Sequence, residues 1–577
     1  MPQEKFQKES FQNFGGINSK TSNYMKGDRE VIDLLNVDFT KPGSWTKAPG
    51  STFYTGVTVS GRVTGLYEYE KLSGVSQIIY TAGTVAYRLD GVNPIAIRTG
   101  LNASAVTDFT TFVDTLFVTN GSEIFKWDGV NASTFGVPTG PIGLTGALGG
   151  AAGLSGTFQY AAAYLTTTGS YGPIGNLFTI GVTNTAVNLS GFSIVPDYGI
   201  TAIAFYRTSP GGSDLFRIGF ANAGTATFVD SALPLSTIPP VDTVGLFTGS
   251  TAAPKYLEIF QNHLFQLGFS GALSTARFSY QALPEQFREN DFFEVRTNDG
   301  DRITGARTFQ QQLVIGKERS LHRLSGDNRL NFVLNEITDQ YGVLSNRAMA
   351  QYEDALVFLD RKGICEFNGA GVRIISTPVE NVFLTMNVDA ARENAVAIHN
   401  RLRNEIWFGI PTMGATLNNL TVVYDYYSKA WTKFSGFDPS SLAYIKGPFN
   451  RQTAFYGGYT GSIHFTSASL LSHNGVPMEM RVNTQFYNIL GNSFTTQWRR
   501  LFVDIDTQNG ATLTINFKTN DMSNTVLTRY IGLNEFQKRL DFGIPSKSLA
   551  MEFIFTSASF PLVIDGFTLE GRLQRKV

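Results

Sequence analysis

Short apolar runs separated by turn signals recur along the chain, and the clearest example is LFVTNGSEIFKWDG at Leu116–Gly129. An apolar run ends at Asn120-Gly121, and a second run from Ile124 to Trp127 follows. Asn-Gly between two apolar runs favours a tight hairpin, because both central positions of that turn need φ > 0. The stretch therefore predicts two antiparallel strands joined by a short turn.

Looser versions of this hairpin pattern recur at a period of roughly 40–50 residues, the range in which four-stranded propeller blades repeat. A single hairpin cannot bury its apolar face alone, so blades stacked around an axis are the physical solution. We therefore predict an all-β fold with a β-propeller of about seven blades, six to eight being compatible with the pattern. An irregular all-β protein with many hairpins is the alternative. The other copies begin at Gln77, Leu264, Leu313, Leu356, Glu405 and Ala454.

One long gap interrupts the repeat, and its sequence predicts an inserted module. The Gly-rich stretch at Gly143–Gly156 reads as a linker or long loop. Short alternating strands with turn signals then follow over about 80 residues, as in immunoglobulin- or fibronectin-like sandwiches. Within this module we expect Tyr160, Ala162 and Tyr164 to face one side of a strand, and Ile203, Phe205 and Arg207 to lie on a later one.

The two ends of the chain lack the repeat. The first fourteen residues form an arm that we expect to dock on this subunit or on a neighbour, and Trp45 lies in a short strand between two Pro-Gly turns. From about Asn474 onward, strands and turns predict a small β-sandwich or platform. The predicted division of the chain is 1–50 (arm and lead-in segment), 51–142 (first blades), 143–245 (linker and inserted sandwich), 246–472 (remaining blades) and 473–577 (C-terminal region).

The charge content changes the expected surface more than the expected fold. Charged residues make up 16% of the chain, against a usual share of about 25%, and the net charge is −1. No global basic field therefore favours clamping of nucleic acid. A surface of Ser, Thr, Asn and Gln can be buried against other subunits without stripping water from many charges. This pattern suits a subunit of an assembly.

No apolar run reaches the roughly 18 residues that a membrane-spanning helix needs, and the first residues lack the apolar core of a signal peptide. We therefore expect assembly in a cytosol-like compartment. The single cysteine, Cys365, lies in a predicted strand, where we expect a buried thiol, and it allows no disulfide within the chain.

The sequence assigns no catalytic, cofactor-binding or metal-binding residue. The five histidines show no metal-ligand spacing, and we interpret them as ordinary strand residues. Gly316-Lys317 lacks the upstream glycine of a phosphate-binding loop. Arg499-Arg500 beside Trp498 are expected at a surface or interface rather than on nucleic acid. The histidines are His263, His322, His399, His464 and His473.

Carboxylates are the one class that leaves an enzymatic alternative open, because propellers include glycosidases with acids converging on the channel. The candidates are Glu285, Asp299, Asp301, Asp128 and Asp360. An Asp before Gly in a hairpin is the expected turn residue, since its side chain accepts from the local backbone. That role accounts for Asp90, Asp128 and Asp299 without any catalytic function.

Six short motifs follow one another in a fixed order along the chain. They are Gly-Gly-Ile-Asn at Gly15–Asn18, Asp-x-x-Asn-Val-Asp at Asp33–Asp38, the stretch Gly43–Gly50, Pro-Glu-x-Phe at Pro284–Phe287, Asp-Gly before Ile303–Gly305, and Tyr-Asp-Tyr before Ala430–Thr432. This ordered series resembles the tail nozzle, or packaged-DNA stabilisation, proteins of short-tailed bacteriophages, and the resemblance spans about residues 14–470. In the family the third motif usually reads Lys-Arg-Pro-Gly, and Ala48 replaces that arginine here.

The resemblance implies a structural virion protein, assembled in the host cytoplasm into a phage tail. It implies a homohexameric ring beneath the head–tail adaptor protein, with tail fibres or a tail-tip protein as further partners. The ring would surround the exit channel for double-stranded DNA, retain the packaged genome and conduct it during ejection, without sequence-specific contacts. Two alternatives stay open from the residues: a receptor-binding tail fibre or spike, and a propeller glycosidase acting on host surface polysaccharide.

Overall fold

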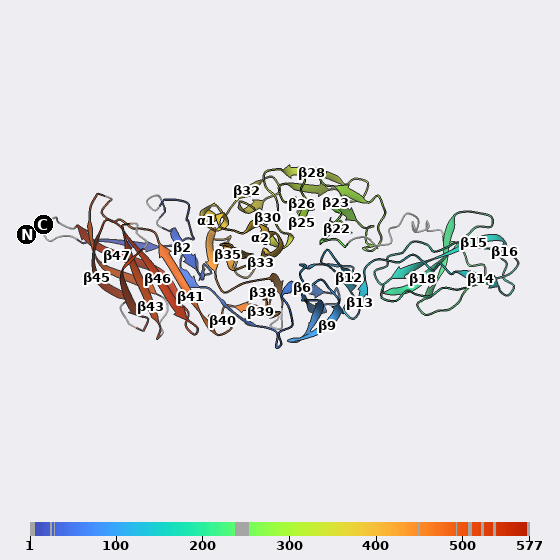
Figure 1. The fold of residues 1–577 in the computed structure, drawn as a ribbon, viewed down its shortest axis with the longest axis horizontal. Helices are drawn as coiled ribbons and strands as arrows, with labels where there is room; N and C mark the ends of the chain where they lie inside the picture. The colour runs from blue at the N-terminus through green and yellow to red at the C-terminus, as the bar shows by residue number, and fades with distance from the viewer. Residues whose placement is uncertain are drawn as a thin grey trace, which may run out of the picture.

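Three β-rich parts lie in a row in the computed structural model, with the propeller in the middle (Figure 1). The inserted sandwich lies at one end and the C-terminal sandwich at the other. The structure describes residues 6–22, 26–27, 29–236, 253–446, 451–491, 493–505, 510–520, 524–534 and 538–573. The predicted end of the insertion at residue 245 lies outside these ranges.

In the described residues, the middle part contains six separate four-stranded antiparallel sheets, which we number as blades 1 to 6. Four further antiparallel strands, which belong to a ten-stranded sheet, form blade 7. Their second strands are buried along most of their length, because each blade packs against a neighbour on both faces. Blades 1 to 6 take their strands in chain order: β6 (Val63–Glu70), β7 (Ser76–Ala82), β8 (Val85–Asp90) and β9 (Asn93–Thr99); β10 (Asp108–Phe112), β11 (Thr115–Thr119), β12 (Ile124–Trp127) and β13 (Ala132–Thr134); β21 (Tyr256–Phe260), β22 (His263–Phe269), β23 (Ala272–Phe278) and β24 (Phe292–Glu294); β25 (Ile303–Phe309), β26 (Gln312–Lys317), β27 (Leu321–Ser325) and β28 (Val333–Thr338); β29 (Met349–Tyr352), β30 (Ala355–Asp360), β31 (Gly363–Phe367) and β32 (Val372–Ile374); β33 (Val396–Asn400), β34 (Glu405–Ile410), β35 (Leu420–Asp425) and β36 (Ala430–Phe434).

Blade 7 is completed by a strand from before blade 1. Its first three strands are β37 (Ser441–Ile445), β38 (Thr453–Gly457) and β39 (Ile463–Ser467), and β5 (Gly50–Phe53) pairs with β39. The prediction that residues 51–53 open the first blades is therefore wrong. Pairing the start of the repeat with its last blade joins the two ends of the ring without a free sheet edge between them.

Apolar clusters between successive blades confirm the propeller. Each cluster contains side chains from two neighbouring blades, and two of the seven also include residues of the C-terminal sandwich. The cluster that closes the ring joins Val63 and Tyr80 of blade 1 to Phe455 and Ile463 of blade 7. Short helices η1 (Asn346–Ala348), η2 (Thr377–Val379), α1 (Glu380–Leu384) and α2 (Val388–Asn394) connect blades 4, 5 and 6.

The insertion between blades 2 and 3 is a two-sheet sandwich around one core. Tyr160, Ala162 and Tyr164 share that core, as predicted, and Ile203 and Phe205 of a later strand pack there too. The Gly-rich stretch is not wholly a linker, because its residues 145–148 form a strand that pairs with β17. The strands are β14 (Thr145–Leu148), β17 (Val187–Ser190) and β20 (Phe228–Asp230) in one sheet, and β16 (Phe178–Thr183), β15 (Ser155–Thr166), β18 (Ile200–Thr208) and β19 (Leu215–Asn222) in the other.

The C-terminal sandwich includes strands from both ends of the chain. Its apolar positions alternate along β43 and β45, as expected for sheets with one buried face. The N-terminal arm docks on this same subunit, because β1 pairs with β47. The strands are β41 (Val476–Thr484), β46 (Leu549–Ser557), β43 (Thr512–Thr519), β44 (Thr525–Gly532) and β2 (Val31–Leu35) in one sheet, continued to blade 7 by β40 (Ser472–His473), and β3 (Val37–Asp38), β4 (Trp45–Lys47), β47 (Val563–Leu573), β42 (Thr496–Ile505), β45 (Arg539–Ser546) and β1 (Gln7–Gln12) in the other.

Candidate functional site

The carboxylates singled out from the sequence hydrogen-bond to protein groups, and three of them shape turns. Asp128 accepts hydrogen bonds from the backbone N–H groups of Val130 and Asn131, both at 2.7 Å. Asp301 accepts from the backbone of Glu318 and Arg319, at 3.2 and 3.0 Å. These bonds shape turns, and the two acids belong to different blades. Asp360 likewise accepts from the N–H groups of Gly342 and Lys362.

Glu285 forms a buried joint between blades 2 and 3 and the insertion. Both of its carboxylate oxygens lie 2.7 Å from Nζ of Lys126 on β12. The hydroxyls of Thr166 and Thr168, from the insertion, donate to Oε2 at 3.1 and 2.7 Å, and the N–H of Gly136 donates to Oε1 at 2.9 Å. The two charged side chains are 3% and 0% exposed. A buried pair whose remaining donors and acceptors are satisfied holds its surroundings in one arrangement.

Asp299 forms a second joint, between blades 3 and 4. Both of its carboxylate oxygens lie 2.8 Å from Nζ of Lys317, whose side chain is fully buried. The same ammonium donates to the carbonyl oxygens of Val295 and Arg296, at 3.1 and 2.8 Å. Lys317, which the sequence associates with an incomplete phosphate loop, is therefore occupied by protein groups.

The lead-in segment, which follows the arm and ends at residue 50, forms a third joint, with blade 6. A Cβ on Gly16 would lie 2.4 Å from the backbone nitrogen of Trp431, so only glycine fits there. The N–H of Ile17 donates to the carbonyl of Trp431 at 3.0 Å. Asn36 (φ 53°) donates to Ser435 Oγ at 3.0 Å and accepts from the Ser435 backbone at 2.9 Å. Two motifs far apart in the chain thus meet here.

The same segment also reaches the C-terminal sandwich. The Asn36 amide donates to the carbonyl of Glu479 on β41 at 2.7 Å. Lys47 donates to the carbonyl oxygens of Leu471, at 3.1 Å, and of Ser557. Burial lowers the pKa of Lys47 to about 8, since an ammonium loses hydration there. Ala48, in place of the arginine of the resembling family, is fully buried in an apolar cluster.

Polar side chains near the propeller axis tie the blades together. Arg347, before blade 5, donates to the carbonyl oxygens of Thr64, Ser440 and Glu393, at 3.2, 2.9 and 2.8 Å. Thr64 belongs to blade 1 and Ser440 directly precedes blade 7, so this side chain spans several blades. Burial lowers the pKa of Arg347 to about 10, but its guanidinium stays protonated at neutral pH.

Two acids on the first strands of blades 2 and 3 escaped the sequence reasoning. These first strands are the inner strands, because they contact the first strands of the neighbouring blades around the axis. Asp108 on β10 accepts from the N–H of Leu257 in the next blade at 2.8 Å, and Glu258 on β21 accepts from the N–H of Thr308 at 3.0 Å. Burial raises the pKa of Asp108 to about 6 and also raises that of Glu258. Neither precedes glycine or belongs to a motif, so only their position on inner strands could have identified them.

The histidines and the cysteine lie in or beside the strands predicted for them. His473 contacts Ser51 Oγ through Nδ1 at 2.9 Å, and Ser51 in turn contacts the Tyr456 hydroxyl at 2.8 Å. Burial lowers the pKa of His464 and of His473 to about 4, so both are neutral at pH 7. Cys365 is fully buried on β31, and burial raises the pKa of its thiol.

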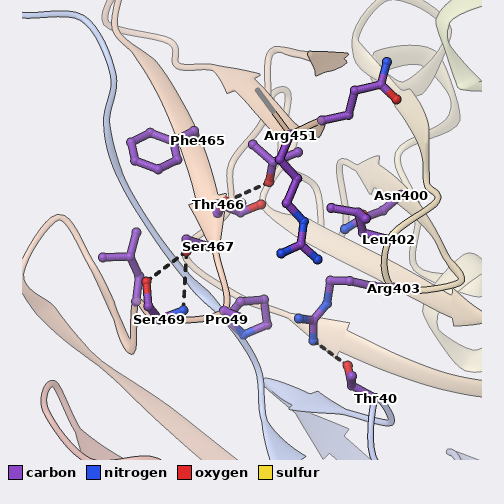
Figure 2. Close-up of a pocket in the computed structure, with 14 residues that line it drawn as sticks. Thr40, Pro49, Asn400, Leu402, Arg403, Arg451, Phe465, Thr466, Ser467 and Ser469 are labelled. Atoms are coloured by element: carbon purple, nitrogen blue, oxygen red, sulfur yellow. Dashed lines mark hydrogen bonds between the residues drawn. The ribbon is translucent and has the colours of Figure 1, made fainter. Parts of the chain in front are cut away.

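A pocket of about 550 Å³ lies beside the lead-in segment, at the hairpin turns of blades 6 and 7 (Figure 2). Figure 2 shows the guanidinium groups of Arg403 and Arg451 and the Asn400 amide directed toward one space. Arg403 pairs with Asp38 and with Glu405. Sequence reasoning missed this pocket, because its lining comes from chain segments more than 350 residues apart. Only a three-dimensional fold brings them together.

Within the described residues, no three His, Cys, Asp or Glu side chains group as metal ligands would. In that same part of the chain, no helix is long and apolar enough to cross a membrane.

Comparisons with known proteins give only weak structural similarities. No family model matches the sequence, and no curated protein matches it. Among solved structures, BBS1N in complex with ARL6DN is 6% identical, with a TM-score of 0.30 over 73% of this chain and 98% of that chain. YCF48 bound to D1 peptide is 10% identical, with a TM-score of 0.25 over 57% and 99%. An exo-beta-1,3-galactanase from Phanerochaete chrysosporium is 8% identical, with a TM-score of 0.18 over 82% and 97%. Similarity at this level carries no inference about activity, ligand or partner.

Proposed function

We propose that this chain is a structural subunit of a bacteriophage tail. In the proposal, copies of the chain form a nozzle ring, with six subunits expected, beneath the head–tail adaptor. The ring retains the packaged genome and conducts it during ejection. Tail fibres or a tail-tip protein are the further partners, and the virion is the location. The resemblance of the ordered motifs in residues 14–470 is the starting point.

One observation carries the proposal: the motif residues are the joints of the molecule. Glu285 joins the insertion to the propeller, Asp299 joins blades 3 and 4, and Gly16 meets Trp431 where the lead-in segment docks. Residues that an enzyme would use for chemistry are here engaged in buried, hydrogen-bonded contacts between parts. Such joints keep an elongated subunit stiff, as the wall of a channel for DNA under packaging pressure requires.

Side-chain contacts inside the propeller indicate that DNA would not pass along the propeller axis of a single subunit. Arg347 reaches from blade 5 to backbone carbonyls at blades 1 and 7, so side chains cross the ring of blades. In the proposal the duplex therefore passes between subunits, through the centre of a cyclic assembly built from heterologous contacts. A duplex carries one negative charge per ~1.7 Å of axis, and a chain of net charge −1 would let it slide.

Two measurements test the proposal. Native mass spectrometry of the purified protein, alone and with the adaptor of the same phage, should give a species near six times 63.2 kDa, and class averages should show a ring. Particles assembled without this chain should lose packaged DNA. Particles that retain and eject their genome normally without it would refute the proposal.

The alternatives predict different outcomes in the same preparations. A trimer would favour a receptor-binding fibre or spike. Release of reducing sugar from host polysaccharide, lost in Asp108→Asn or Glu258→Gln, would favour a glycosidase. We expect neither a trimer nor sugar release. Asp108 and Glu258 accept backbone hydrogen bonds from the next blade, so we assign these two acids a structural role.

A further inference from the structure

The pocket beside the lead-in segment contains an arginine that has no ion pair or hydrogen bond with the residues that the structure describes. Arg403 is neutralised, since it pairs with Asp38 and with Glu405 and donates to Thr40 Oγ1 at 2.9 Å. Arg451, by contrast, has no hydrogen bond or ion pair with any described residue. None of the described residues that line the pocket is acidic. Among the described lining residues, Arg451 is therefore the charged side chain that is left without an ion pair.

An amide with no hydrogen bond to any described residue faces the same space. Asn400 is 2% exposed, and its side chain makes no hydrogen bond to any residue that the structure describes. Figure 2 shows this amide directed toward the guanidinium groups. The residue is buried as a whole, but its amide opens onto the pocket, where a ligand can hydrogen-bond to it. Asn400 is thus the second group that is poised for a ligand.

The remaining lining combines hydroxyls with apolar surface. Ser467 and Ser469 lie 2.9 Å apart through their hydroxyl oxygens, and Pro49, Phe465 and Leu470 supply carbon surface. A volume of about 550 Å³ falls within the range of small-molecule sites, which combine an apolar lining with a few placed polar groups. Hydroxyl and amide groups match the ring hydroxyls of a sugar, and apolar walls match its C–H faces.

We propose that this pocket binds an acidic saccharide, a sugar ring that carries a carboxylate. The planar guanidinium of Arg451 pairs with the carboxylate, a geometry that favours two parallel hydrogen bonds. Asn400 and the two serines bond the ring hydroxyls, and Phe465 packs against the ring. The proposal is independent of the nozzle function, because it needs neither a ring of subunits nor DNA.

Three matched probes separate the contribution of the ligand carboxylate to binding from that of the ring hydroxyls. They are glucuronate, which has both, glucose, which lacks the carboxylate, and cyclohexanecarboxylate, which lacks the hydroxyls. Binding to the full-length protein is measured by ligand-observed NMR and by calorimetry at low ionic strength, where charge pairing is least screened. We expect glucuronate to bind at least tenfold more tightly than either other probe. Equal binding of glucose would exclude a role for the charge, and equal binding of cyclohexanecarboxylate would exclude a saccharide.

Two variants locate the site. Arg451→Gln should weaken glucuronate binding at least tenfold, and because the side chain is exposed the fold should not change. Arg401→Gln is the matched control: it removes an exposed charge from the same region, but Arg401 does not line the pocket, and we expect less than a twofold change. Asn400→Ala, checked by circular dichroism, should also weaken binding. No binding by the parent protein, or equal losses in the two arginine variants, would overturn the proposal.

Discussion

At the scale of single residues, the Lys126–Glu285 pair shows how a buried charge can be tolerated. Its ammonium and carboxylate are 3% and 0% exposed and lie 2.7 Å apart. Glu285→Ala should lower the free energy of unfolding by about 3–5 kcal/mol, because it leaves the Lys126 ammonium buried and unpaired. Denaturant unfolding measures this loss.

An exposed ion pair, which links blade 1 to the insertion, is the control for the loss of the buried pair. Arg98 and Asp197 lie 3.1 Å apart, with side chains 30% and 52% exposed, and Arg98→Ala should cost no more than about 1 kcal/mol. The double variant Lys126→Met with Glu285→Leu should recover most of the Glu285→Ala loss, since no charge then stays buried. A loss in Glu285→Ala as small as that in Arg98→Ala would contradict the assignment of this joint.

Two buried histidines predict a pH dependence with a definite sign. Burial lowers the pKa of His464 and of His473 to about 4, against about 6.5 in the unfolded chain. Between these values the unfolded chain binds more protons than the folded one. The contribution of the two neutral histidines to the free energy of unfolding is therefore fully present above pH 6.5 and is lost as the pH drops toward 4. The parent should lose about 2 kcal/mol more than His464→Gln between pH 7 and pH 5.

Urea unfolding of both proteins at the two pH values checks this expectation. Comparing parent with variant cancels the other titrating groups, including Asp108, whose raised pKa acts in the opposite direction. Identical pH dependence in parent and variant would show that His464 is not held neutral by burial.

At the scale of elements, strand β5 closes the propeller, a role that its own sequence does not indicate. Gly50–Phe53 pairs with β39 and completes blade 7. The N–H of Tyr54 donates to the carbonyl of Ile463 at 2.8 Å, so by antiparallel alternation Thr52 directs its own N–H at Phe465. Thr52→Pro removes that donor and should cost about 1–3 kcal/mol.

Hydrogen exchange locates the damage from that substitution. In Thr52→Pro the amides of β39 should exchange faster than in the parent, because β39 becomes a sheet edge. Thr52→Ala is the matched control: it keeps the donor and should leave the exchange of β39 nearly unchanged. Equal protection of β39 in both variants would mean that β5 does not close the propeller.

The hairpins were predictable from sequence because their information is local. Asn120-Gly121 and the apolar runs on either side specify one hairpin without help from the rest of the chain. The same reasoning correctly placed Tyr160 and Tyr164 on one face. It misassigned residues 145–148 as linker, since Gly and Ala carry little strand signal and only pairing with β17 defines that strand.

Joints and pockets were less predictable because their information is not local. Lys126 stands between the buried residues Phe125 and Trp127, a position where a lysine needs a partner, but nothing nearby identifies Glu285 as that partner. The need for glycine at position 16 comes from the backbone of Trp431, which lies against it and is 415 residues away in the chain. The pocket of Arg451 has no sequence signature at all.

At the scale of the whole molecule, the joints predict that the three parts move as one body. In Figure 1 the insertion projects from the propeller at the end opposite the C-terminal sandwich, so a loose joint would let it swing. Lys126→Met with Glu285→Leu should fold but lose the bonds from Thr166 and Thr168 that tie the insertion to blades 2 and 3. Small-angle X-ray scattering should fit the parent as one rigid arrangement and require an ensemble for the variant. If the variant scatters as rigidly as the parent, apolar contacts alone fix the insertion, and the buried pair is dispensable for the stiffness that the nozzle proposal needs.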